Sequence, residues 1–535
     1  MRPRTGIAAF VTVVGVAGAL AATTGPGAQA STADDRGPHL IPGDLLVSTS
    51  DYINDPNIVA GQTILPPGSG SAGKVAVANG NYPYVFNNDT VDGSFGVTSP
   101  LYLNEITPSG RLQDVIPVPS SELNTSFSSK SEGALNLSSD GKYVTFMDYV
   151  AAPDTVDVSN ANTPGVVDPT NPVPGAYYRA VASLSANGKW TFTETNAYSG
   201  NNGRAAVMAR VDGKYYYYTA GNAGNGSNPQ PSGVVLGAGT QIISPSDLPE
   251  SAQTPGQPTP VGSFSVTELG DKADKVGKDD NFRGLALYNN VLYYTKGSGG
   301  NGVDTIYFLD TTGKACPNGV GVPAANAPLP TSSIASTLTT AGLASNMCIL
   351  KGFPTALAST ATDASDYPFG LWFANPTTLY VADEGAGDSA YANGSYTAAA
   401  ASTTAGLQKW VYNATAGEWQ PAYTLQNGLN LGTPYTVRGY PTGINSVTNL
   451  PWAPSTDGLR NITGKVNRNG TVTIWAVTST VSGGGDQGAD PNQLVSVTDR
   501  LGATALPSGE RFFSVVAPRY DQVVRGVSFT PGNDR

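Results

Sequence analysis

Five charged residues recur at the start of similar short, strand-like segments in this 535-residue sequence: Glu132, Arg204, Arg283, Arg460 and Arg525. If these segments lie side by side, four guanidinium groups and one carboxylate meet at one end of them. Arginine binds carboxylate, sulfate and phosphate groups through paired, charge-assisted hydrogen bonds. The pattern therefore predicts a site for an anionic ligand.

Three of these residues are candidates for a catalytic role. Glu132 would act as a general base or a metal ligand, while Arg283 and Arg525 would neutralise the anion and stabilise developing negative charge. The residues predicted to bind the ligand are Arg204, Arg460 and Asn281. The predicted activity is that of a hydrolase or lyase acting on an anionic ester, lactone or saccharide.

Two alternatives remain open for the same residues. The protein could bind a ligand or carbohydrate without catalysis, in which case no base is needed. Each arginine could instead pair with an acid, such as Asp280, Asp457 or Asp521, and hold neighbouring structural units together.

The sequence holds few residues for other kinds of chemistry. Its single histidine, His39, lies close to the N-terminus, so Ser-His-Asp triads and histidine-bound zinc or copper are not expected. Haem and nucleotide cofactors are not expected either. The two cysteines, Cys316 and Cys348, are predicted to form one disulfide. In the chain-entropy model this bond would contribute about 3.7 kcal/mol of stability.

Calcium is the one cofactor that the sequence suggests. The loop from Asp383 to Asp388 is acidic and rich in glycine, and calcium is bound by carboxylate and carbonyl oxygens. Asp383, Glu384 and Asp388 are the predicted metal ligands. They would supply only part of a calcium coordination shell, and the loop does not match an EF-hand.

Residues 1–30 have the features of a secretory signal peptide. Arg2 and Arg4 precede an apolar run from Ile7 to Ala22, and an A-x-A cleavage site ends at Ala30. A membrane anchor is the disfavoured alternative, because the apolar run is short and a polar segment follows it. We therefore expect a secreted, extracellular protein whose residues 31–535 form a single domain.

The charge balance restricts the partners of the protein. The formal net charge is −11, and it becomes more negative once the two arginines of the signal peptide are removed. Nucleic acid and membrane surfaces are therefore not expected as partners. An anionic small molecule or saccharide is the expected partner of a monomeric protein.

Strand patterns predict the fold that positions these residues. Residues 282–288 and 291–295 are rich in β-branched and aromatic side chains, and Asn289-Asn290 between them suits a tight turn. Similar units begin near positions 132, 204, 369, 460 and 525. Unequal repeats of one β-unit predict an all-β, six-bladed β-propeller. Seven blades are possible if residues 435–447 form their own blade, and a β-helix or stacked sandwiches are further alternatives.

The two chain ends are predicted to share one blade. The last segment, Arg525 to Thr530, resembles the first strand of a unit, but no further strand follows it. The N-terminal region supplies three strands, near 44–50, 101–107 and 111–118, that lack such a first strand. Pairing of the two ends would close the ring and remove an exposed sheet edge.

Several of these motifs resemble a known group of proteins. Glu132-Gly133, the segment 280–284 and Asp383-Glu384 resemble inner-strand motifs of secreted six-bladed propellers of the gluconolactonase, paraoxonase and esterase-like phytase type. This resemblance implies a catalytic calcium held at the channel by Glu132 and Asn281. The whole mature chain also resembles an uncharacterised family of extracellular bacterial and fungal proteins, which implies no particular activity.

Overall fold

The structure is a computed structural model that describes residues 40–52, 62, 64–65, 74–75, 97–127, 129–156, 158–166, 175–222, 239–249, 262–263, 281–298, 303–316, 318–324, 327–331, 347–358, 366–445, 448–484 and 487–532. The predicted signal peptide, His39 and Asp280 lie outside the described residues. Pro38–Arg535 forms one compact unit, and this unit contains all of the blades.

The first three blades are small antiparallel sheets, each built from an innermost strand outward. Blade 1 contains β33 (Gln522–Phe529), β1 (Leu45–Asp51), β5 (Leu101–Ile106) and β6 (Leu112–Pro117). Blade 2 contains β8 (Asn136–Leu137), β9 (Tyr143–Tyr149), β10 (Arg179–Ser185) and β11 (Trp190–Thr195). Blade 3 contains β12 (Gly203–Val211), β13 (Lys214–Gly221), β14 (Thr240–Ile243) and β15 (Gly262–Ser263).

The remaining three blades follow the same order. Blade 4 contains β16 (Phe282–Tyr288), β17 (Val291–Lys296), β18 (Thr305–Leu309), β20 (Met347–Leu350) and the parallel edge strand β19 (Val320–Gly321). Blade 5 contains β21 (Pro368–Asn375), β22 (Thr378–Asp383), β25 (Gly406–Asn413) and β26 (Glu418–Leu425). Blade 6 contains β29 (Ser455–Val466), β30 (Thr471–Val481), β31 (Leu494–Arg500) and β32 (Phe513–Val516).

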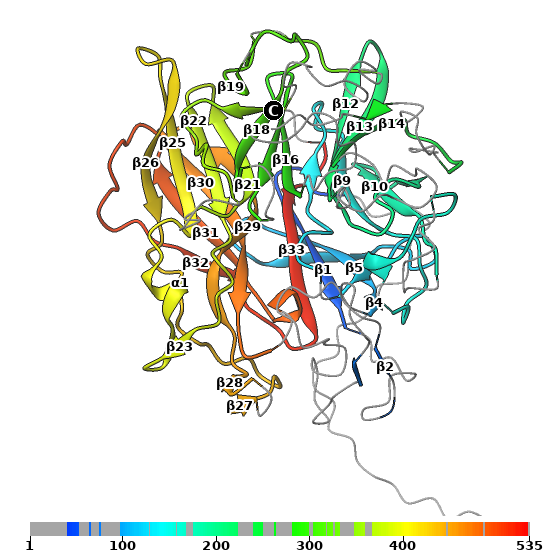
Figure 1. Ribbon diagram of the computed structural model, residues 1–535, viewed down its shortest axis with the longest axis vertical. Helices are drawn as coiled ribbons and strands as arrows, with labels where there is room; N and C mark the ends of the chain where they lie inside the picture. Colours follow the sequence, from blue (N-terminus) through cyan, green and yellow to red (C-terminus); the bar gives the residue numbers. More distant parts are fainter. Residues whose placement is uncertain are drawn as a thin grey trace, which may run out of the picture. The chain divides into compact units, whose positions relative to one another are not determined.

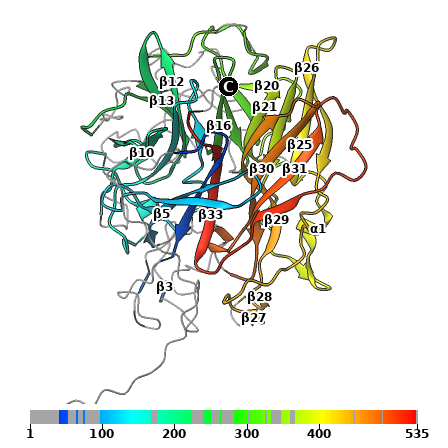
Figure 2. The same cartoon turned by 180° about the vertical axis from the view of Figure 1, so that it is seen from behind.

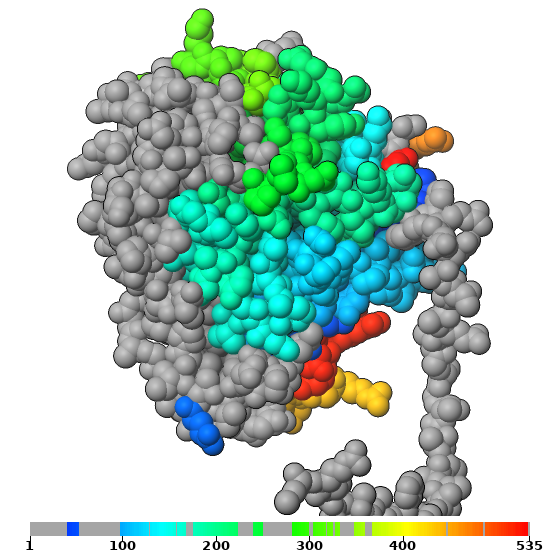
Figure 3. Space-filling model, turned by 90° about the vertical axis from the view of Figure 1, so that its right-hand side faces the viewer, coloured from blue at the N-terminus to red at the C-terminus, as the bar shows by residue number. Residues whose placement is uncertain are grey.

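The six blades form a closed ring. Each innermost strand contacts the innermost strand of the next blade, in the order β8, β12, β16, β21, β29, β33 and back to β8. Figure 3 shows one side of this ring, where residues of blades 1, 2 and 3 follow one another from light blue to green. The predicted six-bladed β-propeller is therefore confirmed.

The possible seventh blade does not form. Within residues 435–445 and 448–451, the strands are β27 (Ile444–Asn445) and β28 (Leu450–Pro451), which pair only with each other. Together with α1 (Thr397–Ala401) they lie at the lower end of the blades in Figures 1 and 2, the end at which β33 begins.

The two ends of the chain close the ring as predicted. β1 pairs along its whole length with β33, from Leu45 opposite Phe529 to Asp51 opposite Gln522. Figures 1 and 2 show these blue and red strands side by side. β33 is the innermost strand, so blade 1 is complete only when the C-terminal strand joins the three N-terminal ones.

Apolar side chains between the blades form the core. One cluster joins blades 1 and 2, a second joins blades 2 and 3, and a third extends from blade 3 through blade 5. In the third cluster the rings of Tyr288 and Phe373 stack with their centroids 4.6 Å apart and link blade 4 to blade 5. Burial of each large aromatic side chain contributes on the order of 2 kcal/mol.

The glycines near the start of the innermost strands have a packing role. A Cβ atom at Gly284 would lie 2.0 Å from the carbonyl oxygen of Phe369 in the next blade. A Cβ atom at Gly370 would lie 2.4 Å from the carbonyl oxygen of Arg460, again in the next blade. The repeated motif therefore marks the places where innermost strands approach each other most closely.

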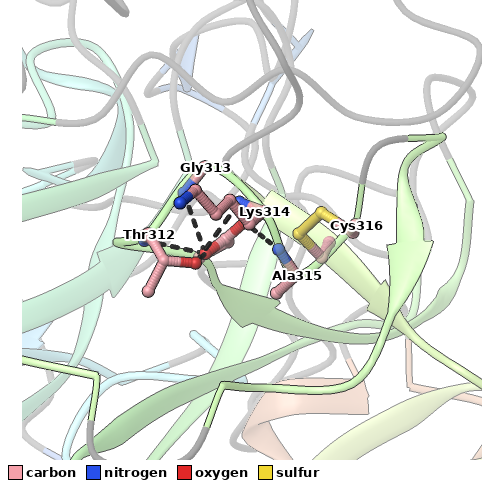
Figure 4. The surroundings of a disulfide bond; sticks show 7 residues. Thr312, Gly313, Lys314, Ala315 and Cys316 are labelled. Atoms are coloured by element: carbon pink, nitrogen blue, oxygen red, sulfur yellow. Dashed lines mark hydrogen bonds between the residues drawn. A yellow bond between two sulfur atoms is a disulfide. The ribbon is translucent and has the colours of Figure 1, made fainter.

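Cys316 and Cys348 form the predicted disulfide, with their Cα atoms 5.9 Å apart. The carboxylate of Asp310 accepts hydrogen bonds from the main-chain nitrogens of Thr312, Gly313 and Ala315, so it holds the turn that leads into Cys316 (Figure 4). The chain between the two cysteines carries β19, which the disulfide ties to β20.

Among the described residues, no helix has the length and apolar character needed to cross a membrane.

Candidate functional site at the mouth of the central channel

The fold brings the five predicted charged residues to one end of the ring. All blades run outward in the same order, so their innermost strands begin at the same end, which we call the mouth. The five side chains belong to buried residues, which are at most 6% exposed: Glu132, Arg204, Arg283, Arg460 and Arg525. A ligand could reach them only through the mouth itself.

A small cavity lies between the innermost strands, beyond the mouth. The cavity between the innermost strands has a volume of only about 20 Å³, which is space for about one water molecule. Its lining comes from five blades and includes Asn136, Ala205, Gly284, Gly370 and Asn461. This cavity is therefore too small to hold a saccharide.

Glu132 is held by three hydrogen-bond donors. Its carboxylate accepts hydrogen bonds from the hydroxyls of Ser129 and Tyr149 and a 2.8 Å bond from the side-chain amide of Asn202. Burial and the negative charge of Glu132 raise the pKa of Tyr149 well above its ordinary value. Tyr149 therefore stays protonated and acts as a donor to Glu132.

A second carboxyl group, that of Asp148, lies beside Glu132. Both carboxyl oxygens of Asp148 are sealed from solvent, and among the described residues the Thr125 hydroxyl is their one hydrogen-bonding neighbour. Burial, followed by the negative charge of Glu132, raises the pKa of Asp148 well above its ordinary value, although Thr125 and Arg525 oppose the shift. Burial therefore favours the neutral form of Asp148, next to a carboxylate that accepts three hydrogen bonds.

Arg283 reaches across the mouth from blade 4 to blade 2. Its guanidinium donates hydrogen bonds to the Ser131 hydroxyl at 3.1 Å and to the Ser298 hydroxyl at 2.5 Å. Its Nε has no hydrogen-bond partner, and no carboxylate pairs with it among the described residues. Asn281 joins the same group, because it donates to Ser298 and accepts a hydrogen bond from Arg204.

The hydrogen bonds of Arg525 have a largely structural role. Its Nε donates to the Ser50 hydroxyl at 2.9 Å. Its terminal nitrogens donate to the carbonyl oxygens of Ser126, Phe127 and Ser129. Arg525 therefore fixes the loop that leads to Glu132, and most of its donors are already used within the protein.

Arg460 forms an ion pair that links two blades. This is the alternative role considered for these arginines, in which each one pairs with an acid. Its Nε lies 3.2 Å from Oε2 of Glu384, so blade 6 is paired with the end of blade 5. The acid is Glu384 rather than the expected Asp457. Burial raises the pKa of both Asp457 and Asp490 to about 7, and the charge of Arg460 opposes this shift at each.

The three predicted calcium ligands have other partners or are exposed in this structure, and the calcium site stays a prediction. The oxygens of Asp383 accept hydrogen bonds from the main-chain nitrogens of Tyr367 and Gly385 and from the Gln408 amide. Glu384 is paired with Arg460, and Asp388 is exposed. The three are not among the described residues whose ligand atoms cluster within 4.8 Å. These side chains do not fit the oxygen-rich shell that calcium needs.

The group that does cluster at that distance is Asp310 with Cys316 and Cys348. Its two sulfur atoms are joined in the disulfide, and Asp310 caps the adjoining turn. This group is therefore structural.

Sequence reasoning missed several residues of the mouth: Ser131, Asp148, Tyr149, Arg179 and Asn202. Arg179 is fully buried against the ring of Tyr149, with its guanidinium carbon 5.1 Å from the ring centroid, and burial lowers its pKa to about 10. A usable signal was present at Asp148, because its carboxyl group lies in a strand whose neighbouring residues Phe146 and Met147 are apolar. Asn202, the partner of Glu132 that precedes the first strand of blade 3, carried no such signal.

Fold and site together define a six-bladed β-propeller with a buried, charged mouth. No family model matches the chain, and no curated protein matches it. The resemblance to gluconolactonase-type propellers therefore stays a prediction.

Solved structures similar to this chain share 9–12% sequence identity with it. An α-L-arabinofuranosidase from Lactobacillus brevis is 11% identical over 76% of this chain and 95% of its own, with a TM-score of 0.29. An ulvan lyase of family PL25 bound to -[GlcA(1-4)Rha3S]- is 12% identical over 82% and 92%, with a TM-score of 0.28. NanB with Optactamide is 9% identical over 78% and 63%, with a TM-score of 0.32. These similarities are too low to bear on the activity.

Proposed function

We propose that this protein binds an anionic ligand at the mouth of the channel and that Arg283 recognises the anion. The ligand would be a small molecule or saccharide that carries a carboxylate, sulfate or phosphate group. The proposal places the protein outside the cell, which the signal-peptide features of residues 1–30 and the Cys316–Cys348 disulfide support.

The environment of Arg283 carries the proposal. The residue is 5% exposed, and within the described part of the chain its guanidinium donates to two hydroxyls and its Nε has no partner. A buried charge without a counter-ion is costly. An anion would supply the missing charge, and the hydroxyls of Ser131 and Ser298 could rotate to donate to it.

The charges around the mouth favour this position over the opposite side. Glu384, Asp457 and Asp490 lie with Arg460 at blades 5 and 6. Arg460 already has Glu384 as its counter-ion there, whereas Arg283, at blades 2 and 4, has no paired carboxylate among the described residues.

Calorimetric titration with sulfate, phosphate and glucuronate at matched ionic strength tests the proposal. Arg283→Ala should weaken binding about tenfold or more, which corresponds to loss of a charge-assisted hydrogen bond of roughly 1.5–3 kcal/mol. Arg468→Ala removes the same charge from an exposed position and should bind like the wild type. Equal affinities for wild type and Arg283→Ala would contradict the proposal.

A hydrolase or lyase remains the second candidate because of Glu132 and Asp148. Two neighbouring carboxyl groups in different environments suit a base and an acid. Here Glu132 accepts hydrogen bonds from three donors, whereas Asp148 is sealed from solvent with the Thr125 hydroxyl as its one hydrogen-bonding neighbour among the described residues. Turnover of anionic esters, lactones and saccharides that disappears in Glu132→Gln, while the anion still binds, would support catalysis. Anion binding without turnover across such a panel would leave the binding function alone.

A further inference from the structure

A second cavity lies between blades 4 and 5, far from the mouth. Its volume is about 660 Å³, and the Asn289-Asn290 turn between β16 and β17 forms part of its rim. This turn is six residues along the strand from Arg283, which corresponds to about 20 Å. The cavity is therefore separate from the proposed anion site.

Three parts of the chain form its walls. Blade 4 contributes Tyr293, and blade 5 contributes Pro376, Tyr412 and Trp419. The third wall is the segment 322–324, which follows β19 and lies between the two disulfide-bonded cysteines. The Cys316–Cys348 bond thus anchors one wall of the cavity to blade 4.

The aromatic rings in the cavity are held firmly by other rings. Trp419 packs against Tyr412 and Phe373, with centroid distances of 5.6 Å and 5.9 Å. Tyr293 packs against the same Phe373 at 4.6 Å. A ligand would therefore meet a rigid aromatic surface, which loses little entropy on binding.

The polar ends of these rings have no partner within the described part of the chain. No hydrogen bond is formed there by the hydroxyls of Tyr293 and Tyr412 or by the indole N–H of Trp419, and none of these atoms is sealed from solvent. By contrast, the indole N–H groups of Trp410 and Trp475 donate to Gln408 and to the carbonyl of Pro108. Tyr and Trp usually satisfy these groups when they are enclosed.

The lining has a definite chemical character. None of the residues that line the cavity is charged. Asn290 adds a side-chain amide at the rim, in an exposed turn position with a φ of 63°. The volume falls within the range of about 300–1,000 Å³ that is usual for small-molecule sites.

We propose that this cavity binds a neutral saccharide. The half-buried ring of Tyr412 offers a surface for the C–H groups of a sugar, and Tyr293 and Trp419, which are 6% and 5% exposed, contribute the small exposed parts of their rings. The phenol, indole and amide groups match sugar hydroxyls, which both donate and accept hydrogen bonds. The lack of charge separates this ligand from the anion proposed for the mouth.

Saturation-transfer NMR and calorimetry on the full mature chain test this inference. The probes are neutral arabino-, xylo-, cello- and manno-oligosaccharides. Tyr412→Ala should weaken binding about tenfold through loss of a stacking ring. Asn290→Gly should also weaken it, because glycine keeps the positive φ of the turn and removes only the amide.

The controls separate this site from general effects and from the mouth. Tyr102→Ala, at a half-buried tyrosine in blade 1, and Asn449→Gly, at another exposed positive-φ turn, should bind like the wild type. Arg283→Ala should also keep saccharide binding. If Tyr412→Ala proves unstable, Tyr412→Phe removes the hydroxyl alone. Absence of binding to every probe, or unchanged affinity in the Tyr412 and Asn290 variants, would overturn the inference.

Discussion

The side-chain oxygen of Asn461 in blade 6 accepts a 2.7 Å hydrogen bond from the main-chain nitrogen of Val527 in blade 1. Asn461 directly follows Arg460, at the position that glycine occupies in blades 1, 2 and 4. In blade 6 a side chain therefore bridges to the next blade, at the junction where the C-terminal strand completes the ring.

Asn461→Ala should lower the free energy of unfolding by about 1–3 kcal/mol, because it leaves the buried Val527 N–H without a partner. Chemical denaturation of the wild type and the variant measures the difference. Equal midpoints would show that the hydrogen bond contributes nothing to stability.

Removal of residues 523–535 should unfold the whole propeller. The deletion takes away almost all of β33, so β1 loses the partner with which it pairs from Leu45 to Asp51 and exposes a sheet edge. Circular dichroism and limited proteolysis report the result, with a chain that ends at Gly532 as the matched control. A folded, protease-resistant shorter chain would contradict the importance of ring closure.

Gly370→Ala should destabilise the protein by about 1–3 kcal/mol. The new methyl group would lie 2.4 Å from the carbonyl oxygen of Arg460, a main-chain atom that cannot move without shifting blade 6. Gly502→Ala is the control, since a Cβ atom there meets nothing within 4 Å. Thermal melting should separate the two variants, and similar melting temperatures would disprove the packing role of Gly370.

Asp457 should make the protein more stable at mildly acidic pH. Burial raises its pKa from 3.8 to about 7, so between these values the folded state binds more protons than the unfolded state. Stability then rises as pH falls from about 7 toward about 4, and this contribution is lost as pH rises above 7. Asp457→Asn should flatten the dependence and gain stability at pH 8, as denaturation at pH 5 and pH 8 would reveal. An unchanged pH dependence would argue against the raised pKa.

The fold could be predicted further than the site. The hairpin at Asn289-Asn290 depends on neighbouring residues only, and both asparagines adopt the positive φ values that its turn requires. The repeat of this pattern, together with an unmatched strand at each chain end, was enough to predict six blades and their closure.

The mouth was harder to predict because its contacts join distant parts of the chain. Arg283 donates to a residue 152 positions away, and Arg525 to carbonyl groups almost 400 positions away. A run of charges does not reveal which arginine will meet a carboxylate, a hydroxyl or a main-chain carbonyl. The loop at Asp383 had the composition of a calcium loop, but its oxygens are used locally by main-chain N–H groups.

The position of β33 also sets the order of events during folding. Residues 522–529 are synthesised after every other strand of the ring, yet they form the innermost strand of blade 1. Until they emerge, β1 has no inner neighbour and blades 2 and 6 have nothing to close against. Completion of the ring must therefore follow synthesis of β33, and until then the blades can form only an open arc.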